Sequence, residues 1–150
     1  MKIAFISNPN KLSGKLTKFF TGSYCYHVAL VDEINGVMYD QNLLLRRRLW
    51  PHYGDETTVT LIESPVKITS EYMEQLLSTD EATYGWIDYC LFALRPVYHL
   101  FGKSTRNANG VICSELVYSV LLMNGWKHRF KEVPSPADLE RVLNGRKTTE

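Results

Sequence analysis

The chain has 150 residues, of which 45% are hydrophobic and 22% are charged, and this composition is typical of one folded domain with a sizeable core. A formal net charge of +1 provides no global positive field, which disfavours binding of nucleic acid or of an anionic membrane through bulk charge. The N-terminal segment lacks the long apolar region and the small-residue cleavage site of a signal peptide. Residues 89–101, the most apolar stretch, fall short of the roughly 20 residues that cross a bilayer. We therefore expect a cytoplasmic protein with no stable membrane association.

The first half of the chain predicts an antiparallel sheet. After the first strand, Ser13 can cap a short helix that ends near Thr21. The dipeptide Asn35-Gly36 is best suited to a two-residue hairpin turn between the second and third strands. The strands are predicted over residues 2–7, 26–32, 37–42 and 57–63.

The second half predicts helices. Thr69 can cap a helix that runs to Leu77, and a mostly helical region follows from Ile87. The polar residues 102–110 form a loop, after which a helix over residues 112–124 is closed by a glycine, and a last short helix begins at Ser135-Pro136. With strands early and helices late, residues 1–150 are predicted to form a single α+β domain.

The cysteines indicate thiol chemistry rather than a metal centre. Cys25, Cys90 and Cys113 are the only three, so they cannot all pair within one chain. Neither these cysteines nor the four scattered histidines have the close spacing of zinc ligands. We expect reduced thiols, no structural metal and no cofactor.

Cys113 should occupy the first turn of its helix, because it directly follows the polar loop. The unpaired N–H groups and the dipole of a helix start favour a thiolate, which is the reactive form of cysteine. An N–H group of the same turn could also donate to a developing oxyanion. Cys113 shares one helix face with Leu116, Val117 and Val120, so its sulfur should point toward the sheet. Taken alone, a cysteine here is more commonly a small buried hydrophobe.

His27 lies on the second strand and can serve as a base if a polar neighbour orients its ring. A two-residue hairpin loop places Val31 opposite Asp40, with both Asp40 and Asn42 on the face of His27. Asn42 is then a diagonal neighbour at roughly 7 Å. Asp40 is four positions from the residue opposite His27, roughly 13 Å at about 3.3 Å per residue, and would need a bulge. This register favours Asn42.

These residues resemble the circularly permuted NlpC-type papain-like enzymes, which include YiiX-like bacterial proteins, phage relatives and the lecithin:retinol acyltransferase family. The resemblance spans roughly residues 5–143 and rests on TGSYCYHVALV around His27, VICSELVYSVL around Cys113, the closing SPADL and the segment YGWID. It implies an antiparallel sheet that bears the histidine and packs against the cysteine helix. It also suggests Asp40, in VMYD, as the third residue, so both Asp40 and Asn42 remain candidates. Tyr26 stands where the family usually has serine.

The resemblance implies a cysteine hydrolase in which His27 takes the proton of Cys113 and the thiolate forms an acyl-enzyme. Peptide amide bonds, such as those of peptidoglycan, are the first implied substrate class, and lipid or protein acyl transfer and thioester cleavage are alternatives. A non-catalytic binding or virion component that retains the fold is a further alternative. Without a secretion signal, we expect action in the cytosol, or delivery by lysis or by a virion if the source is a phage.

Three other features have both a functional and a structural interpretation. The run Arg46-Arg47-Arg48 with Trp50 could bind a phosphate, a carboxylate or a membrane surface, but a solvated strand end is more common, and we expect no nucleic-acid partner. Tyr84 could donate a hydrogen bond to an oxyanion or a substrate, although packing is the commoner role. Cys25 is interpreted as a packing thiol and not as the nucleophile.

Overall fold

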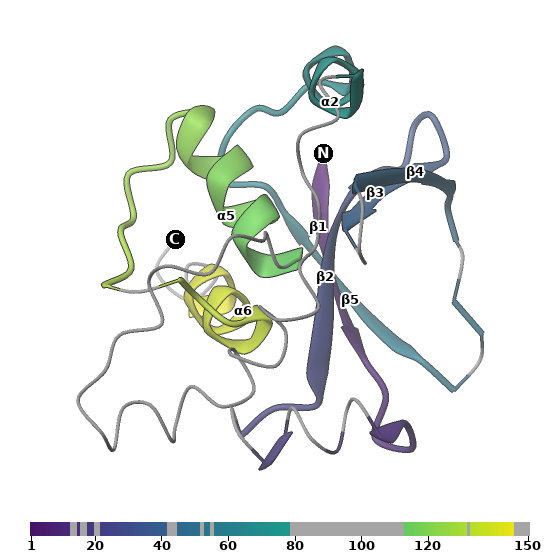
Figure 1. Cartoon of the computed structure of the whole chain (residues 1–150). Helices are drawn as coiled ribbons and strands as arrows, with labels where there is room; N and C mark the ends of the chain where they lie inside the picture. Colours follow the sequence, from purple (N-terminus) through teal and green to yellow (C-terminus); the bar gives the residue numbers. More distant parts are fainter. Residues whose placement is uncertain are drawn as a thin grey trace.

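The computed structural model describes residues 1–12, 15, 18–19, 22–41, 45–51, 53–54, 56–78, 113–131 and 133–145. Within these residues the protein has an α+β architecture built on one antiparallel sheet of five strands in the order β4-β3-β2-β1-β5 (Figure 1). The strands are β1 (Lys2–Ser7), β2 (Cys25–Asp32), β3 (Val37–Gln41), β4 (Leu45–Leu49) and β5 (Thr58–Glu63). The helices are α2 (Ser70–Ser78), α5 (Cys113–Met123) and α6 (Pro136–Gly145). None of these helices has the length and apolar character needed to cross a bilayer.

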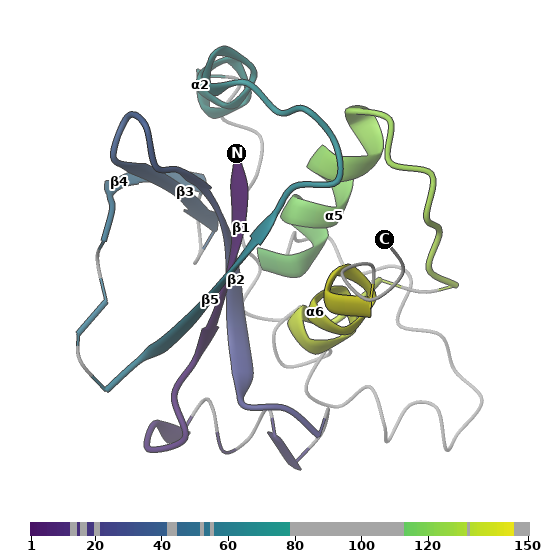
Figure 2. The ribbon, with the colours of Figure 1, turned by 180° about the vertical axis from the view of Figure 1, so that it is seen from behind.

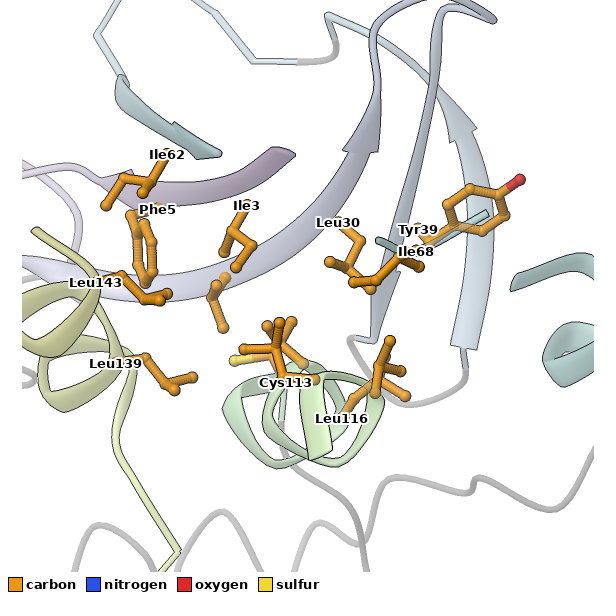
Figure 3. Packing of buried hydrophobic residues seen from close by; sticks show 14 of the residues in the cluster. Ile3, Phe5, Leu30, Tyr39, Ile62, Ile68, Cys113, Leu116, Leu139 and Leu143 are labelled. Carbon is orange, nitrogen blue, oxygen red and sulfur yellow. The ribbon is translucent and has the colours of Figure 1, made fainter. Parts of the chain in front are cut away.

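Both faces of the sheet are buried. Helices α5 and α6 lie together against one side of β1 and β2 in both views of the ribbon (Figures 1 and 2). In the core on this side, Phe5 lies near Leu143 of α6, and Leu30 and Leu116 lie between the sheet and α5 (Figure 3). The opposite face carries the smaller cluster Ala4, Ile6, Ala29, Val31 and Met38, against which Tyr26, Trp50, Tyr53, Val59 and Leu61 pack. Because successive strand residues point to opposite faces, β1 and β2 contribute to both clusters.

Most predicted elements are confirmed, and one strand was missed. β1 matches its prediction, and β2 and β5 each differ by one residue at their start. The arginine run was predicted to be a solvated strand end, but it forms the middle of β4, which pairs with β3. Residues 12, 15, 18 and 19 are helical, as predicted for that segment. Ser13, the helical region from residue 87 and the loop over residues 102–110 lie outside the described residues.

The helix ends have local causes that can be read from the sequence. Thr69 Oγ1 accepts a hydrogen bond from the Tyr72 N–H at 3.2 Å and caps α2. Ser135 and Asp138 form a reciprocal capping box at the start of α6, with backbone-to-side-chain hydrogen bonds of 3.0 and 3.1 Å. Gly125, at φ +94°, ends α5 in the left-handed conformation that glycine adopts most readily.

The loop between β2 and β3 is longer than predicted. Asp32 lies opposite Val37 and Leu30 lies opposite Tyr39, so four residues connect the strands and the predicted two-residue loop is wrong. The Asp32 carboxylate explains the difference, because its Oδ1 accepts the Asn35 N–H at 3.2 Å and stabilises an Asx-type turn. The change of loop length shifts the register of the whole hairpin.

Candidate active site

Cys113 is the first residue of α5, and its side chain points into the space between the helix and the sheet (Figure 3). The residue is buried, with 6% of its surface exposed. The backbone N–H groups of Val28 and Ser114 donate hydrogen bonds to its sulfur. Pairing of β2 with β3 ends at Leu30, so Val28 lies on a part of β2 that β3 no longer covers. The helix start therefore occupies the open edge of β2.

His27 lies between Cys113 and Asp40. Its Nε2 is 3.4 Å from Asp40 Oδ2, and the two side chains are only 13% and 4% exposed. The His27 ring also forms a side-chain hydrogen bond with Cys113. Because Nε2 faces Asp40, Nδ1 is the ring nitrogen available to the sulfur. The structure thus brings together a thiol, an imidazole and a carboxylate from α5, β2 and β3.

The corrected register explains why Asp40 reaches His27. In the last pair, Leu30 lies opposite Tyr39, so Asp40 is one residue beyond that pair on β3 and His27 is three residues beyond it on β2. Such diagonal neighbours are within reach of long side chains. The predicted two-residue loop put Asp40 four positions from the residue opposite His27 and required a hairpin bulge, and that geometry is wrong because the loop has four residues.

A bulge does occur, but on the other side of β2. Ile6 lies opposite His27 and Ser7 lies opposite Cys25, so Tyr26 is an extra residue in β2. Cys25 consequently belongs to the same buried cluster as Cys113, whereas Tyr26 packs on the opposite face of the sheet. The bulge therefore places the side chains of Cys25 and Tyr26 on opposite faces of the sheet.

The electrostatics of the site favour an ion pair between Cys113 and His27. Burial alone would raise the pKa of the Cys113 thiol, but the charge and hydrogen bond of His27 and the two N–H donors lower this pKa below its ordinary value. Burial would likewise lower the pKa of His27, but the Cys113 thiolate and Asp40 outweigh it and raise the pKa to about 9. Both pKa shifts are therefore in the direction that favours a thiolate on Cys113 and an imidazolium on His27.

Cys25 provides a contrast within the same protein. Its side chain is buried, and its thiol donates a hydrogen bond to the His27 carbonyl oxygen at 3.6 Å. Burial raises the pKa of Cys25 to about 12, so this thiol stays protonated at neutral pH. The structure therefore supports the interpretation of Cys25 as a packing thiol.

Two residues near the carboxylate were missed as parts of a site. Arg48 Nε is 3.1 Å from Asp40 Oδ1, and the Arg48 side chain is 26% exposed. Tyr53 is coupled electrostatically to Asp40, and burial raises the pKa of its hydroxyl above the ordinary range. Neighbouring residues of a strand point to opposite faces, which would have placed Arg46 and Arg48 on one face and Arg47 on the other. This inference requires that residues 45–49 first be recognised as a strand.

Asn42, Tyr84 and Cys90 lie outside the described residues. Among the residues that are described, no three histidine, cysteine or acidic side chains gather in a way that could hold a metal ion. Searches of protein-family models, curated proteins and solved structures found no match to this chain.

Proposed function

We propose that this protein is a cysteine hydrolase with a permuted papain-like fold, in which Cys113 is the nucleophile, His27 the acid and base, and Asp40 the residue that orients His27. The observation that carries the proposal is the continuous arrangement of Cys113, His27 and Asp40, with the carboxylate 3.4 Å from His27 Nε2. A nucleophile, a base and an orienting group in contact are the arrangement that nucleophilic catalysis requires.

In the proposed reaction, the Cys113 thiolate attacks the carbonyl carbon of an amide or ester and forms a tetrahedral oxyanion. N–H groups in the first turn of α5 are suited to stabilise this oxyanion, since helix starts present donors without intrahelical partners. The His27 imidazolium then protonates the leaving amine or alcohol, and a thioester remains on Cys113. Water attacks the thioester with neutral His27 as the base, which releases the acid and restores the ion pair.

The proposed reaction transfers an acyl group from an amide or ester to Cys113 and then to water, and peptide amide bonds are the first substrate class to test. The ordering of helix and strands also supports it, because the histidine strand precedes the cysteine helix along the chain. Asp40, buried to 3% exposure, is placed to favour the charged form of the imidazole through both stages.

The first experiment compares the reactivity of the thiols within one sample. The protein is treated with limiting iodoacetamide between pH 5 and pH 9, and alkylation of each cysteine is quantified by peptide mapping. A thiol with the ordinary pKa of 9.0 is only about one part in a thousand thiolate at pH 6. We expect Cys113 to react far faster than this at pH 6, while Cys25 remains unmodified. His27→Ala should remove the advantage of Cys113.

The second experiment measures turnover on a panel of peptide amides and activated acyl esters. Cys113→Ala should abolish hydrolysis of any substrate that the wild type cleaves, and the matched variant Cys25→Ala should retain it. Retention of full activity by Cys113→Ala would rule out the mechanism. If Cys113 is alkylated no faster than an ordinary thiol at pH 6, that result would instead favour a protein that has this fold but is not a catalyst.

A further inference from the structure

The buried carboxylate of Asp40 contacts two different groups through its two oxygens. Oδ2 faces His27 Nε2 at 3.4 Å, and Oδ1 faces Arg48 Nε at 3.1 Å. A carboxylate that is 4% exposed is costly to keep ionised unless a cation or hydrogen-bond donors compensate its charge. His27 can supply that compensation only while its ring is protonated, whereas arginine remains charged at every working pH.

The strand ladder explains how Arg48 comes to this position. Arg46 is directly opposite Asp40 and Arg48 is opposite Met38, so Arg48 approaches Asp40 along the diagonal. Arg47, between them, points away and pairs with Glu74 at 3.1 Å, where both side chains are about half exposed. Alternation along β4 therefore gives adjacent arginines different partners.

We propose that Arg48 is a positioning residue of this site, which holds the Asp40 carboxylate turned toward His27. The inference rests on the proposed function, because its effect is read through the reactivity of Cys113. Arg48 itself contacts Asp40 and acts on the thiol only through Asp40 and His27.

The other groups around Asp40 do not replace the charge of Arg48. The Arg46 side chain is exposed, so its field is weakened by solvent and salt. Tyr53 stays neutral at working pH, because burial and the charge of Asp40 raise the pKa of its hydroxyl. Within the described part of the chain, the titratable and charged groups near Asp40 are His27 on β2, Arg46 and Arg48 on β4, Tyr53 after β4 and Cys113 on α5.

The test follows Cys113 alkylation by iodoacetamide from pH 4 to pH 9 in the full-length protein. In the wild type we expect a reactive plateau across neutral pH that falls off on the acid side. Arg48→Gln should move this acid edge up by about one pH unit and lower the rate about ten-fold on the acid side, because an Asp40 carboxylate that is no longer held toward His27 stabilises the imidazolium less. The matched variant Arg47→Gln should leave the edge in place.

A double-mutant cycle separates positioning from a structural effect. In an Asp40→Asn background, Arg48→Gln should cause no further shift of the edge, whereas a general structural defect would add to that of Asp40→Asn. If Arg48→Gln does not fold, Arg48→Lys decides the question. The contact of Arg48 with Asp40 Oδ1 is an ion pair without hydrogen-bond geometry, so lysine, which keeps the charge, should shift the edge less than glutamine and in the same direction.

The failure of this inference and of the proposed function can be told apart. If His27→Ala leaves the neutral plateau intact, the proposed function is wrong. If His27→Ala removes the plateau but the acid edge stays fixed or moves to lower pH in Arg48→Gln, only the role of Arg48 is refuted. A downward shift would mean that Arg48 acts mainly as a cation that opposes the imidazolium.

Discussion

Asp40→Asn tests how much of the ion pair depends on the carboxylate. The pKa of His27 is raised from 6.5 to about 9. At about 1.36 kcal/mol per pH unit, this corresponds to roughly 3 kcal/mol in favour of the imidazolium. Cys113 contributes the largest share, and Asp40 adds a hydrogen bond and its charge. A hydrogen bond to a charged group contributes about 1.5 kcal/mol, which predicts a roughly ten-fold loss of the reactive ion pair in Asp40→Asn.

The assay combines alkylation with turnover, because alkylation reports the Cys113 thiolate and turnover also reports the His27 imidazolium. Alkylation needs only the thiolate, so in Asp40→Asn the plateau at neutral pH should fall and reactivity should return as pH approaches the ordinary thiol pKa of 9.0. Turnover also needs the imidazolium as an acid. We expect the alkaline limb of turnover near pH 9 in the wild type, where His27 would deprotonate, and about one pH unit lower in Asp40→Asn.

A matched control separates this effect from a loss of stability. Asp32 is also buried, at 8% exposure, but it serves the loop after β2 and not His27. Asp32→Asn should lower the free energy of unfolding without changing the pH profile of Cys113. A neutral plateau and an alkaline limb that are unchanged in folded Asp40→Asn would refute the assignment of Asp40 as the orienting residue.

Two further predictions concern stability. Gly125→Ala should cost about 1 kcal/mol of unfolding free energy in urea denaturation, because φ is +94° and a Cβ there meets nothing within 4 Å, so the cost is one of backbone conformation alone. Gly145→Ala, at another helix end with open space and no positive φ, is the control and should cost little; an equal loss in both would contradict the argument. Ser135→Ala should lower stability by about 1 kcal/mol through loss of the capping box of α6, measured in the same way, and an unchanged midpoint would contradict that role.

The elements that could be predicted from sequence are those with local causes. The strand patterns of β1, β2 and β5 and the caps at Thr69, Ser135 and Gly125 depend on residues within a few positions of one another. The position of Cys113 at the start of α5 was predictable for the same reason, because a polar loop directly precedes an apolar helical pattern. Local signals therefore located the thiol and the histidine strand.

The parts that could not be predicted depend on tertiary contacts. The Asn35-Gly36 dipeptide suggested a two-residue turn, but the Asp32 side chain organises a four-residue loop and also accepts a hydrogen bond from Ser70, far along the chain. That difference decides whether Asp40 can reach His27. Strand β4 was missed because three consecutive arginines give no apolar alternation, although two of them form ion pairs once β3 and α2 are in place.

The open edge of β2 is the feature on which the whole site depends. If β3 continued to pair with β2 beyond Leu30, strand backbone would occupy the position from which the Cys113 sulfur accepts the Val28 N–H. The divergence of β3 makes room for the start of α5 and leaves a donor for the thiolate. The divergence of β3 also allows the His27 ring to reach the Cys113 sulfur around the edge of β2. Ala29 and Val31, which alternate with His27 along β2, face away from the helices. Neither the cysteine nor the histidine pattern alone distinguishes chemistry from packing, and their meeting at this edge is what supports the proposed nucleophile and base.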